Sequence, residues 1–427
     1  MKQEYLVIEN AGSLHGTVHV DGAKNAVLVI IASLILTTGK SRLHNVPASA
    51  DVYQMIALLK NLGADILFDA ENNILEVDTH ALNAYTVGPE IMKKMRASIL
   101  VMGPLLARFG RAHIALPGGC VLGTRPIDFH LKAFARMGTH IEIVDEFLNA
   151  TVSRVLTPCR FVLDYPSVGA TENIIMAAAL TPGTTCIINA ALEPEVFDLM
   201  NVLGKMGARI IVRPPAMIEI EGVETLQPIE HTIMPDRLEA GTLLLAAAMT
   251  HGEIFIPNAK ADELEVFLEK LSEMGHEIST GIANVGIRLK ATPCPRAVSF
   301  KTMPYPGFPT DLQAPMMAAQ CLASGTSIID ETVYENRLVH VRELQKMGAH
   351  IVVSGTTATI KGVEALYGTQ VIASDIRASV ALILAGLAAQ GPTQTMMTGI
   401  QHVRRGYQNL ELKLQKLGAH IKLVASE

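Results

Sequence analysis

One cysteine lies in a segment whose composition favours backbone geometry over core packing. Cys120 falls within residues 116–126, a run that also holds three glycines and two prolines. Glycine permits unusual backbone angles and close approach of other groups, and proline fixes the backbone on either side. Arg125 follows five residues later, and a nearby positive charge favours the thiolate form of cysteine. The pattern predicts a reactive thiol on a shaped loop.

The remaining cysteines are scattered, without the spacing of a metal site or a disulfide framework, and we interpret them as packing residues. They are Cys159, Cys186, Cys294 and Cys321. His113 and His130 flank the cysteine loop, so a Cys–His nucleophilic pair is an alternative role for Cys120. The sequence identifies no Asn or Asp that would orient either histidine.

A second set of chemically capable residues recurs at the starts of apolar helical stretches. The six positions are Lys24, Arg96, Gly169, Arg237, Asp311 and Arg377, and all except Gly169 are charged. A helix N-terminus offers free N–H donors and partial positive charge, so an added cation there costs stability while it suits an anionic ligand. The pattern predicts a shared anion site. Asp311 has two interpretations, a helix N-cap or a partly buried carboxylate that acts as a base.

Six internal repeats position these residues. A Leu-Gly or Met-Gly pair ends a helical pattern and begins a strand at intervals of 68 to 75 residues, and an earlier helix–Gly–strand junction precedes each pair. Gly is the expected residue just beyond a helix end. Each unit therefore reads as a buried apolar helix, a strand, a loop, an amphipathic helix and a further strand. Six units in 427 residues indicate two domains of three units each.

Two of the six units are longer than the others, and both extensions carry arginine. The extra residues of the second unit form the cysteine loop with Arg125, and those of the sixth unit surround Arg404 and Arg405. Insertions in repeat proteins map to loops that often lie on the binding face. These arginines are therefore candidates for binding phosphate or carboxylate, with a solvated surface charge as the alternative for Arg404.

The composition excludes several classes of protein. The chain is 49% hydrophobic and 18% charged, with a formal net charge of −6, which argues against general nucleic-acid binding. No apolar run approaches the roughly 18 residues of a membrane span, and the N-terminus lacks a signal-peptide pattern. Gly39-Lys40-Ser41 resembles the end of a P-loop, but the motif's first glycine would fall at Leu34. We expect a protein of the reducing cytoplasm.

Ten stretches of the chain resemble the enolpyruvyl transferases, and they extend over almost the whole sequence. They are residues 22–26, 94–98, 116–120, 125–130, 167–173, 235–237, 307–311, 335–337, 375–379 and 405–407. Within this family the motifs are similar to the branch that uses UDP-N-acetylglucosamine. The resemblance implies an α/β fold of two similar domains, each with three βαβαββ repeats around buried helices, in an inside-out α/β barrel.

The resemblance also implies a reaction. The enolpyruvyl group of phosphoenolpyruvate passes to the 3-hydroxyl of UDP-N-acetylglucosamine, and phosphate leaves, in the first committed step of bacterial peptidoglycan synthesis. Addition gives a tetrahedral ketal phosphate, which then eliminates. Asp311 is expected to take the proton of the sugar hydroxyl, and Cys120 to donate a proton to the methylene carbon, with a covalent adduct as a side capability. No metal or organic cofactor is implied.

Further residues are assigned to the two substrates by the same resemblance. Lys24 and Arg405 join Cys120 and Asp311 in the catalytic set. Phosphoenolpyruvate is expected to contact Lys24, Asn25, Arg125 and Arg405. The nucleotide sugar is expected to contact Asn25, Arg96, Arg125, Pro126, Ile127, Asp128, Phe129, Ser167, Val168, Asp311 and Val333. The expected supporting residues are Arg237, Arg337, Asp375 and Arg377.

The expected first domain covers residues 22–230 with the cysteine loop at 116–126, and the second covers 1–21 and 231–427, with the active site in the cleft between them. The cysteine loop is expected to act as a lid.

Three positions depart from the usual family pattern: Arg404, where Asp is usual, Asp21, where Ser or Gly is common, and Ala50, where some members have a basic residue. The alternatives to this function are the shikimate-pathway enolpyruvyl transferase, which has the same fold and a different acceptor, and a non-catalytic nucleotide-sugar-binding paralogue, to which only Arg404 points.

Overall fold

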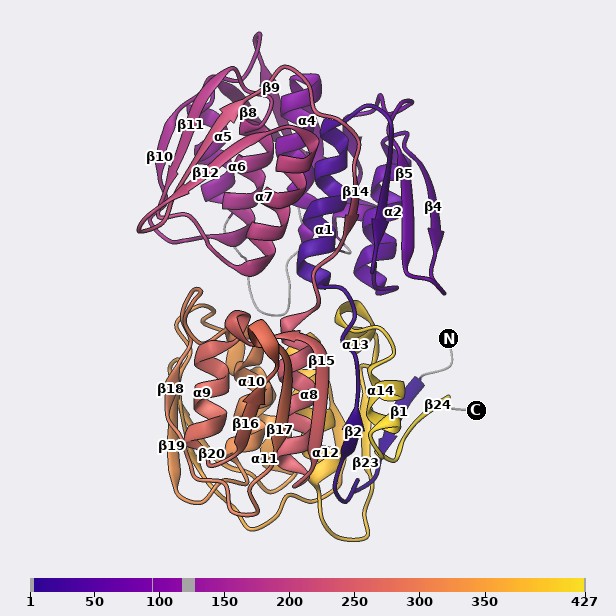
Figure 1. Cartoon of the computed structure of the whole chain (residues 1–427), viewed down its shortest axis with the longest axis vertical. Helices are drawn as coiled ribbons and strands as arrows, with labels where there is room; N and C mark the ends of the chain where they lie inside the picture. Colours follow the sequence, from indigo (N-terminus) through magenta and orange to yellow (C-terminus); the bar gives the residue numbers. More distant parts are fainter. Residues whose placement is uncertain (1–3, 94, 117–126, 426–427) are drawn as a thin grey trace. The chain divides into compact units, whose positions relative to one another are not determined.

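The computed structural model describes residues 4–93, 95–116 and 127–425, apart from the side chain of Arg96. The chain divides into two compact units, coloured by sequence in Figure 1. The N-terminal unit is Gly22–Met234, and the C-terminal unit joins Met1–Asp21 to Pro235–Glu427. The boundary lies four residues beyond the expected position 230, because strand β14 (Glu230–Thr232) pairs with β3 (Lys40–His44) of the N-terminal unit.

Within the described ranges, each unit contains three four-stranded sheets. The strands of the N-terminal unit, in sheet order, are β14, β3, β5 (Ile74–Asp78) and β4 (Asp65–Asp69); β6 (Thr86–Val87), β7 (Arg111–Ala115), β9 (Phe147–Val152) and β8 (Thr139–Val144); and β10 (Arg160–Val162), β11 (Gly183–Ile188), β13 (Met217–Gly222) and β12 (Arg209–Arg213).

The strands of the C-terminal unit follow the same plan. In sheet order they are β2 (His15–Thr17), β15 (Glu253–Lys260), β17 (Val285–Lys290) and β16 (Glu277–Thr280); β18 (Phe300–Lys301), β19 (Thr326–Asp330), β21 (Thr357–Lys361) and β20 (His350–Ser354); and β22 (Gln370–Ile372), β23 (Thr395–Thr398), β1 (Glu4–Ile8) and β24 (Ile421–Ala425).

All six sheets share one pairing pattern. The first strand is parallel to the second, and the second, third and fourth pair antiparallel. In four sheets the two parallel strands follow one another in strand order along the chain. In the other two sheets the first strand comes from a distant part of the chain: β14 pairs with β3, and β2 pairs with β15. The predicted α/β class built from βαβαββ repeats is confirmed by this arrangement.

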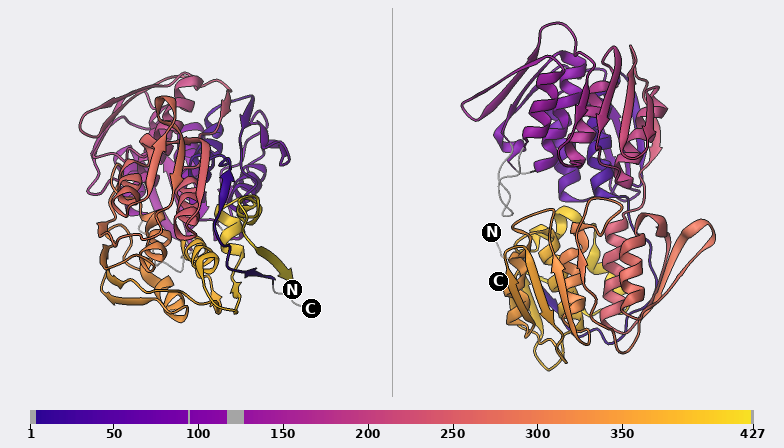
Figure 2. Two further views of the ribbon diagram at one scale, coloured as in Figure 1. Left: turned by 60° about the horizontal axis from the view of Figure 1, so that its bottom comes forward. Right: turned by 90° about the vertical axis from the view of Figure 1, so that its left-hand side faces the viewer.

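In the described part of the chain, six apolar helices form the interior of the two units (Figure 2). They are α1 (Lys24–Ser33), α4 (Met102–Phe109), α6 (Val168–Ala178), α8 (Arg237–Met249), α10 (Gln313–Gln320) and α12 (Ile376–Ala388). All residues of α8 are buried, and α8, α10 and α12 contact one another. Helices that are apolar on every side require such an enclosed position, since no polar face is available for solvent.

Six amphipathic helices among the described residues pack with one face toward this interior, as the apolar spacing of the second helix in each repeat predicts. They are α2 (Ala50–Asn61), α5 (Asp128–Arg136), α7 (Pro194–Met206), α9 (Glu265–Glu273), α11 (Val341–Lys346) and α14 (Leu410–Lys416). A left-handed glycine follows each of them, with φ between 85° and 111°. This confirms the glycine signature that defines the repeats.

The first helix–strand junction of the fourth repeat, at Gly252, differs in backbone conformation from those of the other repeats. Gly252 does not adopt a left-handed conformation, and His251 takes that role with φ 53°. A Cβ atom on Gly252 would lie 2.0 Å from the backbone oxygen of Leu14. Glycine is needed there for the close passage of the segment that leads into β2.

Among the described residues, no helix combines the length and the apolar character required to cross a membrane.

Candidate active site

The carboxylate of Asp311 lies between two guanidinium groups in the C-terminal unit. Arg337 Nη2 lies 2.5 Å from Asp311 Oδ1, and Arg377 Nη2 lies 2.7 Å from Oδ2. Both arginine side chains are almost completely buried, and Asp311 is three-quarters buried. Asp311 belongs to the 3-10 turn η5 (Thr310–Leu312), whose N-cap is Pro309, and Leu312 is the N-cap of the following helix α10 (Gln313–Gln320), so the N-cap interpretation of Asp311 was wrong.

The charges in this cluster control its protonation. Burial alone would raise the pKa of Asp311, but the guanidinium of Arg377, followed by that of Arg337, holds this pKa well below its usual range. Burial lowers the pKa of Arg377, and Asp311 more than reverses that effect. Asp311 is therefore ionised at neutral pH, and it is a weak base while both arginines face it.

Two further contacts orient Arg377. Its Nη1 donates to the hydroxyl of Tyr407 over 3.2 Å, and that hydroxyl also lies 3.0 Å from Oγ1 of Thr242. Asp375 caps α12 by accepting from the N–H groups of Arg377 and Ala378. The cap places a carboxylate at the helix N-terminus, which offsets the cost of the cation in the first turn.

Arg337 retains an unused donor. Its Nη2 also donates to the backbone oxygen of Thr310 over 3.1 Å, whereas its Nε is buried and makes no hydrogen bond within the described part of the chain. A buried guanidinium N–H without an acceptor costs free energy, so this atom would gain from an anionic ligand.

Glu331 links Asp311 to the segment that contains Val333, and it was not anticipated from the sequence. One carboxylate oxygen accepts from Thr310 Oγ1, next to Asp311, over 3.0 Å. The other accepts from the N–H groups of Val333 and Tyr334 over 2.8 and 3.0 Å. Glu331 is fully buried, so the turn around Val333 is fixed relative to Asp311.

The remaining cations of the C-terminal unit differ in their surroundings. Arg237 is buried, and its guanidinium lies 5.8 Å from the ring centre of Tyr305. Arg405 lies in α13 (Gln401–Gly406), where burial and then its positive charge lower the pKa of His402. Arg404 is half exposed and forms an ion pair with Glu4 of β1 over 2.9 Å.

Lys24 opens α1 in the N-terminal unit, as the residue spacing predicts. Its Nζ lies 3.0 Å from Oδ2 of Asp51, the second residue of α2, and the two side chains are 14% and 4% exposed. Ser49 caps α2 by accepting from the N–H of Val52. The carboxylate offsets the cost of placing an ammonium group at the positive end of α1. Asn25, the next residue, is half-buried.

Five of the predicted nucleotide-sugar residues, at 127–129 and 167–168, lie at the starts of two helices. Ile127 precedes α5, which begins with Asp128, and Asp128 forms an ion pair with Lys132 over 3.2 Å. Ser167 caps α6 by accepting from the N–H of Ala170, and Val168 is its first residue.

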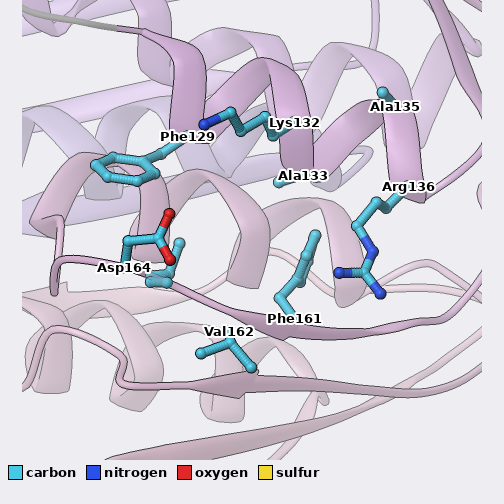
Figure 3. A pocket seen from close by; sticks show the side chains of 9 residues that line it. Phe129, Lys132, Ala133, Ala135, Arg136, Phe161, Val162 and Asp164 are labelled. Carbon is cyan, nitrogen blue, oxygen red and sulfur yellow. The ribbon is translucent and has the colours of Figure 1, made fainter.

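A cavity of about 340 Å³ lies between α5 and the segment that contains β10 (Figure 3). Phe129 lines one end, with the ammonium of Lys132 5.8 Å from its ring centre. Arg136 lies 5.7 Å from the ring centre of Phe161 at the other end. Asp164 is the acidic residue of this lining, which is otherwise apolar or basic.

Both histidines that flank the cysteine loop contact an asparagine. His130 is buried, and its Nδ1 lies 3.0 Å from Nδ2 of Asn173. His113 stacks on Phe147 and hydrogen-bonds through Nδ1 to Oδ1 of Asn149. These partners could not be identified from the sequence, because each lies more than 30 residues away along the chain.

Several predicted residues lie outside the described part of the chain. They are Cys120, Arg125 and Pro126, together with the side chain of Arg96. Conversely, Asp51 and Glu331 contact the predicted residues Lys24 and Val333, although no sequence signal identified them. Thr242 contacts Tyr407, which in turn accepts from the predicted residue Arg377. Tyr407 does lie in one of the recognised motifs. Among the described residues, no group of three His, Cys, Asp or Glu side chains is arranged to hold a metal ion.

Comparison with known proteins gives matches over nearly the full length. Residues 8–414 match the family described as EPSP synthase (3-phosphoshikimate 1-carboxyvinyltransferase). A UDP-N-acetylglucosamine 1-carboxyvinyltransferase of Cellvibrio japonicus is 46% identical over 98% of this chain and 99% of its own. UDP-N-acetylglucosamine 1-carboxyvinyltransferase 1 of Caldanaerobacter subterraneus is 48% identical over 99% of each chain.

Solved structures give the same fold. The enolpyruvyl transferase NikO from Streptomyces tendae matches with a TM-score of 0.90 at 25% identity, and the match covers 100% of both chains. EPSP synthase from Acinetobacter baumannii has a TM-score of 0.77 at 16% identity, over 99% of this chain and 100% of its own.

Proposed function

The chain belongs to the enolpyruvyl transferase family, and from this premise we propose that it transfers the enolpyruvyl group of phosphoenolpyruvate to the 3-hydroxyl of UDP-N-acetylglucosamine and releases phosphate. The protein is a transferase, and the reaction is the first committed step of peptidoglycan synthesis. The observation that carries this conclusion is 46–48% identity over nearly the full length of relatives that bear that name.

The reaction makes two demands on the site. Addition of the sugar oxygen to C2 of phosphoenolpyruvate requires loss of the hydroxyl proton and arrival of a proton at C3. Elimination then requires loss of a C3 proton and departure of phosphate. Two polyanionic substrates also require several fixed cations, since charge shifts toward the leaving phosphate. The cations proposed to meet this demand are Lys24, Arg125, Arg337, Arg377 and Arg405.

Asp311 is the proposed acceptor of the hydroxyl proton. With Arg337 and Arg377 both facing it, its basicity is low. An anionic substrate group that shares these guanidinium groups would weaken their hold on the carboxylate and raise its basicity when the substrates are present. The buried Nε of Arg337, which makes no hydrogen bond among the described residues, supports a ligand at this place.

Cys120 is the proposed proton donor to C3, and this assignment rests on the sequence motif. Lys24 and Arg405 complete the proposed catalytic set, and Asn25 is proposed to contact both substrates. Lys24 belongs to one unit and Asp311 to the other, so the proposal requires both units to contribute to one reaction.

The nucleotide-sugar assignments for Ile127, Asp128, Phe129, Ser167 and Val168 remain part of the proposal. They are supported by their grouping at the starts of α5 and α6, where backbone N–H groups suit a diphosphate. A cytoplasmic location is also proposed, because both substrates are multiply charged and do not cross membranes unaided.

The decisive assay measures phosphate release with both substrates present. Release that depends on UDP-N-acetylglucosamine, and that 3-phosphoshikimate does not support, is the expected result. Release with 3-phosphoshikimate instead would favour the EPSP synthase activity, 3-phosphoshikimate 1-carboxyvinyltransferase, for which the matching family is described. Calorimetric binding of the nucleotide sugar without any phosphate release would favour a non-catalytic paralogue.

A further inference from the structure

The two segments that join the units are hydrogen-bonded to one another. The chain passes from one unit to the other between Asp21 and Gly22, and again between Met234 and Pro235. The N–H of Ala23 donates to the oxygen of Met234 over 2.7 Å, and the N–H of Asp236 donates to the oxygen of Asp21 over 2.8 Å. The two connectors therefore form one paired element.

A largely buried cluster of three charged side chains holds this element. The N–H of Asp21 donates to Glu239 Oε2 over 2.8 Å. Lys413 Nζ lies 2.6 Å from Glu239 Oε1 and 2.8 Å from Asp21 Oδ2. The side chains of Lys413 and Glu239 are 12% and 4% exposed, so water screens these contacts weakly.

The three residues come from different parts of the C-terminal unit. Glu239 lies in the first turn of α8, Lys413 lies in α14, and Asp21 lies on the connector itself. On the other side of the junction, a Cβ atom on Gly22 would lie 1.8 Å from the backbone oxygen of Asn45. The first connector is thus fixed on both sides, three residues before Lys24.

We propose that Asp21, Glu239 and Lys413 form a clamp that stiffens the paired connectors, with Glu239 and Lys413 as positioning residues for the reaction. The clamp acts through the backbone that leads to Lys24 and does not itself contact substrate. A stiff connector limits the conformations of the unliganded protein, so less entropy is lost when the substrates bind. This inference rests on the proposed function for its kinetic consequences only.

The charges of the cluster make the clamp sensitive to pH near neutrality. Burial raises the pKa of Glu239 to about 7, against the attraction of Lys413, and Asp21 adds to the rise. Burial lowers the pKa of Lys413, and Glu239 and then Asp21 raise it above its ordinary value, so Lys413 stays charged. Protonation of Glu239 removes its ion pair with Lys413, so the clamp weakens as the pH falls below about 7.

Hydrogen exchange of the connector amides tests the clamp without any substrate. Lys413→Met should accelerate exchange in peptides that cover residues 20–23 and 235–237 by about tenfold, because local opening becomes easier. Lys413→Arg should restore most of the protection, since it keeps the charge. Lys416→Met, an exposed position on the same helix, is the matched control and should leave exchange unchanged. Equal exchange in the wild-type and Lys413→Met proteins would overturn the proposal.

Kinetics provide the second measurement. Glu239→Gln mimics the protonated residue, so its KM for both substrates should exceed the wild-type value several-fold at about pH 8, with kcat within about twofold. The wild-type KM should approach that of the variant at about pH 6, below the value near which Glu239 titrates. A constant ratio of the two KM values across this range contradicts the pH-sensitive clamp. Complete absence of phosphate release by the wild-type protein would instead refute the proposed function and leave the exchange result valid.

Discussion

Arg377 donates to Asp311 through a 2.7 Å contact, although 66 residues separate the two along the chain. Together with the 2.5 Å contact from Arg337, this contact keeps the carboxylate ionised and weakly basic. The same guanidinium groups are proposed to receive the charge of the substrate. The arrangement therefore connects substrate binding to the basicity of the proposed proton acceptor.

Asp311→Asn should lower kcat by about 10²–10⁴-fold, the range typical of a lost general base. Nucleotide-sugar binding measured by calorimetry should be weakened much less, because the amide keeps the shape of the side chain. Asp65→Asn, at an exposed position on β4, is the matched control. A kcat within a few-fold of the wild-type value would remove Asp311 from the catalytic set.

Arg337→Met should lower stability at neutral pH and make stability less dependent on pH in acid. The folded-state pKa of Asp311 lies well below its ordinary value of 3.8, so its contacts with the two arginines contribute stability above about pH 4, and this stability is lost as the pH falls through the lower folded value. Without Arg337 that folded value moves back toward the ordinary value, so less stability is present above about pH 4 and less of it is lost in acid. Urea unfolding midpoints between about pH 3 and pH 6 measure this difference in slope. Arg342→Met on the surface of α11 should leave the profile unchanged.

Asp51→Asn should destabilise the N-terminal unit by about 3 kcal/mol, because it leaves the largely buried ammonium of Lys24 without its carboxylate partner. It should also raise the KM for phosphoenolpyruvate, since Lys24 is a proposed ligand. Ser49→Ala removes the cap of the same helix and should cost about 1 kcal/mol. If both variants change the KM equally, the effect on binding comes from α2 and not from Lys24.

Alkylation by the epoxide fosfomycin, which the family resemblance suggests, should add its mass at Cys120, and faster with the nucleotide sugar present. Burial raises the pKa of Cys321 to about 12 and also raises that of Cys159, so neither thiol should compete. Peptide mass spectrometry locates the adduct. Cys120→Asp should keep activity and lose the label, because a carboxyl group still donates a proton. Labelling at the exposed Cys294 instead would contradict a selectively reactive Cys120.

Arg404→Ala should change stability by less than about 1 kcal/mol, because its ion pair with Glu4 is half exposed. Its activity should stay within about twofold of the wild-type value, since the side chain is directed to β1. Arg405→Ala should lower kcat/KM by at least about tenfold through the loss of a substrate cation. Equal losses in both variants would indicate that Arg404, the departure from the family pattern, acts in the site.

The sequence was sufficient for features that repeat locally. Apolar residues on every side of a helix require burial, and a glycine is favoured beyond a helix end, so the six repeats and their buried helices could be predicted. The same spacing placed Lys24, Arg237 and Arg377 in the first turns of α1, α8 and α12. The helix-end signature included Gly252, but glycine is needed there because the backbone at Leu14 passes close by. A local pattern does not reveal the passage of a distant segment.

Tertiary structure decided which of these residues meet. The sequence by itself determined residue types and periodicity, and hence the elements and the family. Only the fold paired β1 with β23 and β24, brought Arg337 and Arg377 to one carboxylate, and joined Lys413 to Asp21 across almost the whole chain. Such contacts depend on how whole elements pack. A local pattern fixes the face that an element buries, but not the element that covers it.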